Sequence, residues 1–245
     1  MRRSHHDWDD LAAREPYFAV LTEERFLGKL DEERRQDFFA TGEADVRQLL
    51  ELLAERGVEV ASGRALDFGC GVGRLTLPLA RRFRSVTGFD VSPRMVAEAA
   101  RNLESEGFAN AAFVTRLEDL DGSFDFIGSL IVFQHIPVAE GMRQLRHLLR
   151  RLAPGGVAAL HFTLGRPGSR LRRAARRLRA WSPTLHRLLL RLGRSPRDLP
   201  YMQMNIYDRS EVANVIAREA GSDPLVLDCS EGEIEGALFV VRRRR

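Results

Sequence analysis

The sequence predicts an α/β domain built on a doubly wound, mostly parallel sheet. Short apolar segments typical of strands alternate with amphipathic helical segments from about residue 60 onward, and this alternation favours a parallel sheet with helices on both faces. A loop with three glycines, in ALDFGCGVGRLT over 65–76, follows the first strand. The last two strands have no helix between them, so we expect an antiparallel hairpin at one edge of the sheet.

The expected elements follow from the spacing of apolar residues along the chain. Their ends carry suitable residues: Gly57 closes a helix, Ser92 and Asp208 are placed to cap one, and Pro93 suits a first helical position. Strands are expected at 64–68, 85–89, 111–114, 124–133, 157–163, 224–229 and 236–241, and helices at 8–14, 23–30, 43–56, 74–82, 93–106, 138–152 and 209–220.

The N-terminal helices are expected to form a unit of their own. The stretch FFATGE at 38–43 combines two aromatic residues with Thr41 and Gly42, and we interpret it as a hinge in which Thr41 caps the following helix. Residues 1–60 are therefore predicted to be a helical lid segment over a main domain at 61–245.

The composition is typical of a soluble protein. Of the 245 residues, 44% are hydrophobic and 29% charged, and no apolar run approaches the roughly 20 residues that span a bilayer. The N-terminus lacks the apolar core of a secretory signal. Cys70 and Cys229 indicate neither a disulfide framework nor a metal site. We therefore expect a cytoplasmic protein without a metal. The sequence leaves its oligomeric state, monomer or homodimer, open.

The positive charge is concentrated after the fifth strand. Residues 165–199 contain eleven arginines and one acid, Asp198. Because the net charge of the whole chain is +4, the other residues together carry a net charge of about −6. We expect 165–200 to be a basic helical insertion. It could be a lid with solvated arginines, or a helix pair that rests on anionic lipid through Trp181 and leucines. Nucleic acid is the least favoured partner, because aromatic platforms for bases are absent there.

The glycine loop is placed to bind a ligand. In a doubly wound sheet, ligands bind beyond the carboxyl ends of the strands, and glycine lets a ligand approach the main chain closely. Asp67 stands two residues before Gly69, and Gly71 and Gly73 follow; Asp90 ends the next strand. A dinucleotide-binding fingerprint would place its third glycine one residue later, and a P-loop would need a lysine.

Four segments together resemble the class I S-adenosylmethionine-dependent methyltransferases that act on small molecules. They are LDFGCGVG at 66–73, VTGFDVSPRMV at 86–96, DGSFDFIGSLIVFQHIP at 121–137 and LRRLAPGGVAALHF at 149–162, in the family's order and spacing. The resemblance implies a Rossmann-like, seven-stranded sheet with an antiparallel C-terminal hairpin. It also implies S-adenosylmethionine as the cofactor and S-adenosylhomocysteine as its product. We expect no metal, because no pair of carboxylates stands around the loop after the fourth strand.

By the same resemblance, Asp67 and the main chain of Gly69 and Gly71 hold the methionine end of the cofactor. Asp90 binds the ribose hydroxyls, since a carboxylate can accept both protons of a diol, and Met95 packs on the adenine. Arg116 occupies the position where an acid usually meets the adenine amino group, so Glu118 and the Leu117 main chain are assigned there instead. The remaining residues of the predicted cofactor site are Phe68, Gly73, Val91 and Leu130.

Methyl transfer from a sulfonium requires mainly that the acceptor be held in line and water excluded. His135, after the fourth strand, is the candidate base; a cap or a bond to a backbone carbonyl is its structural alternative. Gln134 is placed to position a hydroxyl or amine. The other residues predicted to contact substrate are Tyr17, Phe39, Met202 and Tyr207, although rings in the N-terminal segment also suit a packed interior.

The sequence therefore predicts a methyltransferase that acts on an oxygen or nitrogen atom of a small to medium metabolite. One alternative is a methyltransferase for a lipid, quinone or glycolipid intermediate at the membrane surface, reached through 165–199. The other is a regulatory protein that binds the cofactor or its product and transfers nothing.

Overall fold

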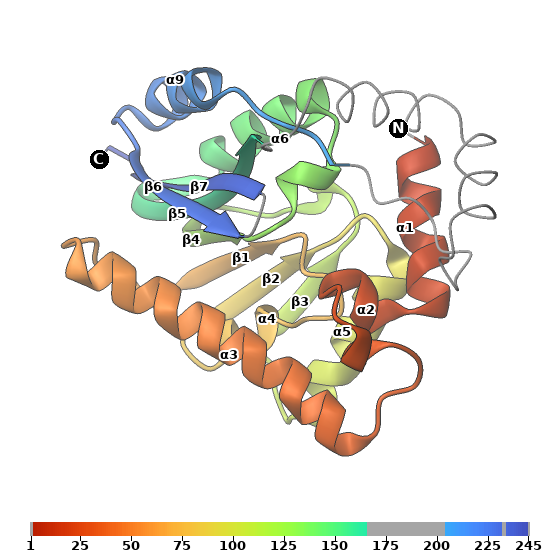
Figure 1. Cartoon of the computed structure of the whole chain (residues 1–245). Helices are drawn as coiled ribbons and strands as arrows, with labels where there is room; N and C mark the ends of the chain where they lie inside the picture. The colour runs from red at the N-terminus through yellow and green to blue at the C-terminus, as the bar shows by residue number, and fades with distance from the viewer. Residues whose placement is uncertain (1, 166–203, 232–233, 245) are drawn as a thin grey trace, which may run out of the picture.

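The computed structural model describes residues 2–165, 204–231 and 234–244. A seven-stranded sheet forms the centre, in the order β3-β2-β1-β4-β5-β7-β6 (Figure 1). Neighbouring strands are parallel from β3 through β5, and β7 runs antiparallel to both β5 and β6. The predicted doubly wound sheet with an antiparallel C-terminal hairpin is confirmed. The strands are β1 (Arg64–Phe68), β2 (Ser85–Phe89), β3 (Ala111–Val114), β4 (Phe124–Ser129), β5 (Leu152–Gly165), β6 (Leu225–Glu231) and β7 (Ile234–Arg242).

Helices cover both faces of the sheet. The α-helices of the described residues are α1 (Arg2–Arg14), α2 (Pro16–Val20), α3 (Glu32–Glu55), α4 (Thr76–Ala80), α5 (Pro93–Ser105), α6 (Val138–Arg150) and α9 (Arg209–Ala220), and the 3₁₀ turns are η1 (Glu24–Phe26), η2 (Leu117–Asp119) and η3 (Phe133–His135). The expected caps are present: the Ser92 side chain accepts from the Met95 N–H at 3.3 Å, and Asp208 accepts from the Glu211 N–H at 2.8 Å.

Two hydrophobic cores lie against opposite faces of the sheet. Strand β5 shows the division, because Val157 and Ala159 belong to one core and Ala158, Leu160 and Phe162 to the other. The first core includes side chains of α3 and α5, and the second includes side chains of α6 and α9. This alternation is the two-residue period of a strand buried on both sides.

The predicted hinge at 38–43 is wrong, because α3 continues through it. Its cap is Asp31, which accepts from the Arg34 N–H at 2.9 Å, while the Thr41 hydroxyl donates to the Phe38 carbonyl within the helix. Gly42 has a packing role instead: a Cβ there would lie 2.1 Å from the backbone oxygen of Arg74. The glycine therefore lets a long helix pack directly on the segment that follows the glycine loop.

The apolar run predicted as one strand over 124–133 divides into two elements. Strand β4 ends at Ser129, and η3 begins at Phe133. Between them Ile131 has a φ of 62°, and it is the non-glycine residue with a positive φ among those described. The backbone therefore turns at the end of β4 and carries the next residues across the carboxyl edge of the sheet.

Most of the basic insertion predicted at 165–200, with Trp181 and its arginines, lies outside the described residues. No helix of the described part is both long and apolar enough to span a bilayer.

Candidate active site

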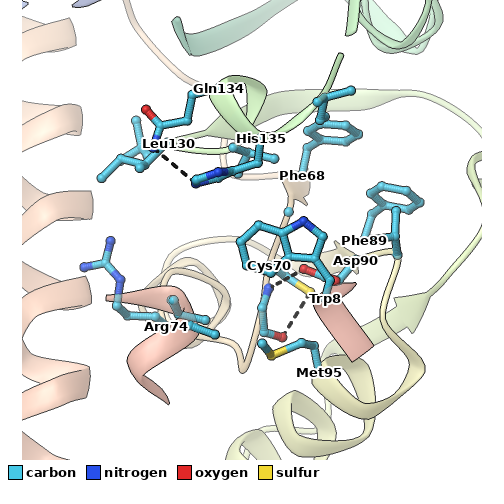
Figure 2. A pocket seen from close by; sticks show the side chains of 18 of the residues that line it. Trp8, Phe68, Cys70, Arg74, Phe89, Asp90, Met95, Leu130, Gln134 and His135 are labelled. Atoms are coloured by element: carbon cyan, nitrogen blue, oxygen red, sulfur yellow. Dashed lines mark hydrogen bonds between the residues drawn. The ribbon is translucent and has the colours of Figure 1, made fainter. Parts of the chain in front are cut away.

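A cavity of about 510 Å³ lies at the carboxyl ends of β1, β2 and β4. Its walls come from the glycine loop, the β2–α5 turn, the β4–α6 connection and the N-terminal segment. Figure 2 shows Gln134 and His135 at one end of it and Asp90 and Met95 at the other, with Trp8 between. The lining residues are 8, 19–23, 68–71, 74, 75, 89–91, 95, 130–132, 134–137, 140, 144 and 204.

The glycines of the loop are required by conformation and by close packing. Gly69 has a φ of 81° and Gly71 a φ of 52°, a region that favours glycine. A Cβ on Gly69 would lie 2.4 Å from the Val132 side chain, and one on Gly71 would lie 2.4 Å from Val20. The loop therefore leaves bare main chain beside two segments that also line the cavity. Gly73 packs away from it, toward α5, where an added Cβ would meet Leu103.

Asp90 joins the glycine loop to the start of α5. Its Oδ2 accepts from the Gly71 N–H at 3.0 Å, and its Oδ1 accepts from the Ser92 N–H at 2.9 Å. Burial raises the pKa of this carboxyl to about 6, against these two backbone bonds. Each carboxylate oxygen can accept more than one hydrogen bond, so Asp90 retains acceptor capacity toward the cavity.

Asp67 lies behind the glycine loop and outside the lining of the cavity. Its side chain is 1% exposed and accepts from the Thr76 hydroxyl at 2.6 Å. Burial raises its pKa to about 6, and the charge of Asp90 adds to that effect. The position therefore ties the end of β1 to α4.

The walls near Asp90 are apolar. Phe68, Val91 and Met95 all line the cavity, and Met95 is 2% exposed. Leu117 and Glu118 are not brought to this lining. The Glu118 side chain is 72% exposed and pairs with Arg116 at 3.6 Å.

At the other end, a chain of hydrogen bonds holds the two polar residues after β4. The buried Thr163 hydroxyl donates to Gln134 Oε1 at 2.8 Å, and Gln134 Nε2 lies 3.2 Å from His135 Nε2. With the amide in this orientation, a neutral His135 ring accepts at Nε2 and carries its proton on Nδ1. The Trp8 ring meets His135 edge to face, with 5.0 Å between centroids. Leu130 also lines the cavity beside them.

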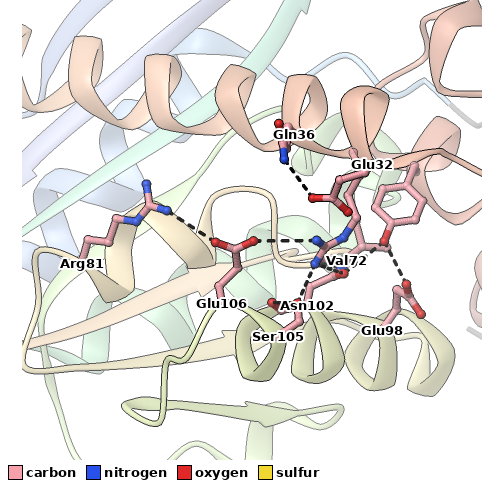
Figure 3. A network of polar contacts seen from close by, with 10 residues as sticks. Glu32, Gln36, Val72, Arg81, Glu98, Asn102, Ser105 and Glu106 are labelled. Carbon is pink, nitrogen blue, oxygen red and sulfur yellow. Dashed lines mark hydrogen bonds and ion pairs between the residues drawn. The ribbon is translucent and has the colours of Figure 1, made fainter.

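Three of the residues predicted to contact substrate lie in the packed interior. Tyr17 Oη lies 2.9 Å from Glu98 Oε1 and 3.1 Å from Asn102 Oδ1 (Figure 3). Phe39 is 7% exposed and packs edge to face on Phe38. Tyr207 packs on Phe162, and its hydroxyl donates to the Ile136 carbonyl at 2.9 Å.

These three large rings fill the protein interior where separate segments pack together. Because they point into that interior, they do not line the cavity. Tyr207 supports the cavity indirectly, because it holds the backbone at Ile136, which does line it. Met202 lies outside the described residues.

Helix α1 reaches the cavity through a polar contact at Asp9. Asp9 Oδ1 accepts from the Ser92 hydroxyl at 2.8 Å, and Oδ2 accepts from Arg94 Nε at 3.0 Å. Partial burial opposes ionisation, but the bonds from Ser92 and Arg94 outweigh it and lower the pKa of Asp9. The contact fixes α1 at the start of α5 and thereby places Trp8 over the cavity.

Several lining residues were not predicted as site residues, among them Trp8, Glu140 and Gln144. Glu140 and Gln144 stand four residues apart on α6, a spacing that puts both on one face of a helix. That spacing was a usable signal. Trp8 had no such signal, because its position depends on how distant segments dock. Among the described residues, no group of His, Cys, Asp and Glu side chains is arranged to hold a metal ion.

Comparison with known proteins agrees with this geometry. Residues 65–156 match the family described as methyltransferase domain. This stretch of the chain is similar to a methyltransferase domain. This domain spans β1 to the start of β5, the same segments that surround the glycine loop and Asp90.

Curated relatives that match this part of the chain include methyltransferases named for small molecules. A ubiquinone biosynthesis O-methyltransferase of Methylocella silvestris is 38% identical over 108 residues, which is 41% of this chain and 41% of the relative. A trans-aconitate 2-methyltransferase of Deinococcus radiodurans is 36% identical over 120 residues, or 48% and 43% of the two chains. The chain thus spans less than half the length of these relatives.

Solved structures share the fold over nearly the whole chain. The magnesium protoporphyrin IX methyltransferase of Synechocystis, with bound SAH, has a TM-score of 0.58 at 21% identity, covering 94% of this chain and 97% of its own. The N-methyltransferase NodS of Bradyrhizobium japonicum, also with S-adenosylhomocysteine, has a TM-score of 0.59 at 14% identity, covering 99% of each chain. At these identities the likeness establishes the fold of the methyltransferase domain with its flanking helices.

Proposed function

We propose that the protein is an S-adenosylmethionine-dependent methyltransferase acting on an oxygen or nitrogen atom of a small to medium metabolite. The observation that carries this proposal is a single cavity with two chemically different ends. One end has bare glycine main chain and the Asp90 carboxylate, and the other has Gln134 and His135. Relatives named as O-methyltransferases, and neighbouring structures that hold SAM or SAH, support it.

The residues near Asp90 fit the proposed cofactor. Asp90 retains acceptor capacity for ribose hydroxyls, Gly69 and Gly71 line the cavity without side chains, and Met95 offers an apolar wall. When bound, S-adenosylmethionine supplies a methyl group on a positively charged sulfur. Asp67 is assigned an indirect part, because its carboxylate braces the loop through Thr76.

The residues at the other end would hold the acceptor and exclude water. Gln134 is fixed by Thr163, so its amide offers a donor in a constant direction. His135 could take the proton of a hydroxyl or amine as the methyl group is transferred, after its contact with Gln134 is exchanged. Trp8 and Met204 close the walls around these groups.

Transfer of a labelled methyl group tests the proposal. The protein is incubated with methyl-labelled S-adenosylmethionine and a small-metabolite extract, beside the His135→Asn and Asp90→Asn variants. We expect labelled product from the parent and at least a tenfold loss in both variants. If the parent binds S-adenosylhomocysteine but forms no labelled product from any extract, the protein is a binding protein and the enzymatic proposal fails.

A quinone or other lipid-like acceptor is a second candidate. It is favoured by the relatives named for ubiquinone biosynthesis and by the apolar walls at Trp8, Ile136 and Met204. Flotation with anionic vesicles at low and high salt tests it, with a variant lacking 166–199 as the comparison. Flotation that is unchanged in that variant would contradict delivery through the basic insertion.

A further inference from the structure

We infer that the acceptor end of the cavity selects a molecule that presents an O–H or N–H donor and carries no negative charge there. This inference rests on the proposed function and specifies its substrate class. The observation behind it is the pair Glu140 and Gln144, one turn apart on α6, which both line the cavity.

The orientation of the Gln144 amide is fixed by its neighbour. Gln144 Nε2 lies 2.8 Å from Glu140 Oε1. Because an ionised carboxylate only accepts hydrogen bonds, the amide nitrogen must be the atom that faces it. Arg143 pairs with the second oxygen of Glu140. The amide oxygen of Gln144 is therefore the end of the amide that does not face Glu140.

That oxygen is buried and has no hydrogen-bond partner among the described residues. Buried polar atoms are nearly always hydrogen-bonded in folded proteins, and an unpaired one disfavours the folded state. Since Gln144 lines the cavity, a bound molecule can supply the missing donor. The atom thus marks the position of a hydroxyl or amine hydrogen on the acceptor.

The charge of the surrounding walls disfavours an anion. The described lining includes three carboxylates, those of Glu23, Asp90 and Glu140, and one guanidinium, that of Arg74. Arg74 is 6% exposed and already pairs with Asp45 at 2.7 Å. A carboxylate or phosphate beside Gln144 would therefore face an acceptor oxygen instead of a donor, and the guanidinium of the described lining already has a carboxylate partner.

The remaining walls define the body of the molecule. Trp8, Ile136 and Pro137 are apolar or aromatic. Ile136 and Pro137 directly precede α6, and the Trp8 ring meets His135 edge to face. A largely apolar molecule with a single alcohol, phenol or amine fits this arrangement, since ligand pockets combine apolar walls with a few placed polar groups.

Matched small probes test the inference directly. Binding of 2-phenylethanol, 2-phenylethylamine and phenylacetate is measured by NMR titration of the full chain, with and without saturating S-adenosylhomocysteine. These probes share an apolar body and differ in the polar end. We expect the alcohol and the amine to bind at least tenfold more tightly than phenylacetate.

The variant Gln144→Met removes the acceptor at nearly constant volume. Loss of one hydrogen bond should weaken the alcohol and the amine by about three- to tenfold, and leave phenylacetate and S-adenosylhomocysteine within about twofold. Gln36→Met is the matched control, because Gln36 makes the same bond to Glu32, at 3.0 Å, on the exposed face of α3 (Figure 3). It should change none of these affinities.

The inference is overturned if phenylacetate binds as tightly as the alcohol, if Gln144→Met leaves the alcohol and amine unaffected, or if no probe binds at millimolar concentration. Failure of the proposed function is a separate result. In that case S-adenosylhomocysteine does not bind the parent protein, whatever the probes do in its absence.

Discussion

Replacing Asp90 by asparagine should weaken S-adenosylhomocysteine strongly, and the size of the effect can be worked from the contacts. Both carboxylate oxygens accept from backbone N–H groups, of Gly71 and Ser92. An asparagine keeps one oxygen and must turn its NH₂ toward one of these donors. It also loses the charge that strengthens a bond from a ribose hydroxyl.

A hydrogen bond to a charged group contributes about 1.5–3 kcal/mol. The variant keeps part of its bonds to the backbone donors and part of its bonds to the ribose. We therefore expect S-adenosylhomocysteine binding to weaken by about 2–4 kcal/mol, which raises Kd about 30- to 700-fold. Calorimetric titration of the parent, of Asp90→Asn and of Glu55→Gln measures it; Glu55 is an exposed carboxylate at the end of α3. A Kd for Asp90→Asn within threefold of the parent would refute the assignment of Asp90 to the ribose.

Three further outcomes are expected. Because the pKa of Asp90 is raised to about 6, S-adenosylhomocysteine affinity should rise from pH 5 to 7, and affinity that is flat with pH contradicts this. The pKa values of both Asp67 and Asp90 are raised in the folded protein, so the contribution of these two carboxyls to folding stability should fall as the pH rises from about 4 to 6. Gly42→Ala should cost about 1–3 kcal/mol, seen as a lower thermal midpoint, since its Cβ would clash with the Arg74 carbonyl; an unchanged midpoint contradicts it. Asp9→Asn should speed S-adenosylhomocysteine release several-fold in stopped-flow measurements by loosening α1, whereas exposed Asp10→Asn should not.

Much of the fold could be predicted because local signals and long-range packing agree. The strands at 64–68, 85–89 and 111–114 match the structure residue for residue. Each is short, apolar and bounded by turn or capping residues, so its length is set locally. The Ser92 and Asp208 caps are local in the same sense, since their bonds reach only three residues along the chain.

The errors in the fold have long-range causes. Gly42 was interpreted as a break, but it is small because Arg74, far along the chain, packs against it. The run at 130–133 was interpreted as strand because it is apolar. Its residues are apolar for a different reason: Leu130 and Val132 line the cavity and Phe133 fills the interior after a turn at Ile131.

The site shows the same division. The glycine loop and Asp90 could be located because each directly follows a strand, and parallel strands bring their carboxyl ends together. Trp8 could not be located from the sequence, because its position depends on the hydrogen bonds that Asp9 accepts from Ser92 and Arg94, which are distant in the chain. Tyr17 and Tyr207 lie outside the cavity lining for a related reason: residue type does not distinguish a ring that lines a cavity from one that packs behind it.

The most direct measurement is a crystal structure of the full chain with S-adenosylhomocysteine. We predict ribose hydroxyls at about 2.6–3.0 Å from Asp90, adenine near Met95, and the sulfur directed toward Gln134 and His135. A nucleoside bound elsewhere, or one whose ribose does not contact Asp90, would contradict the account.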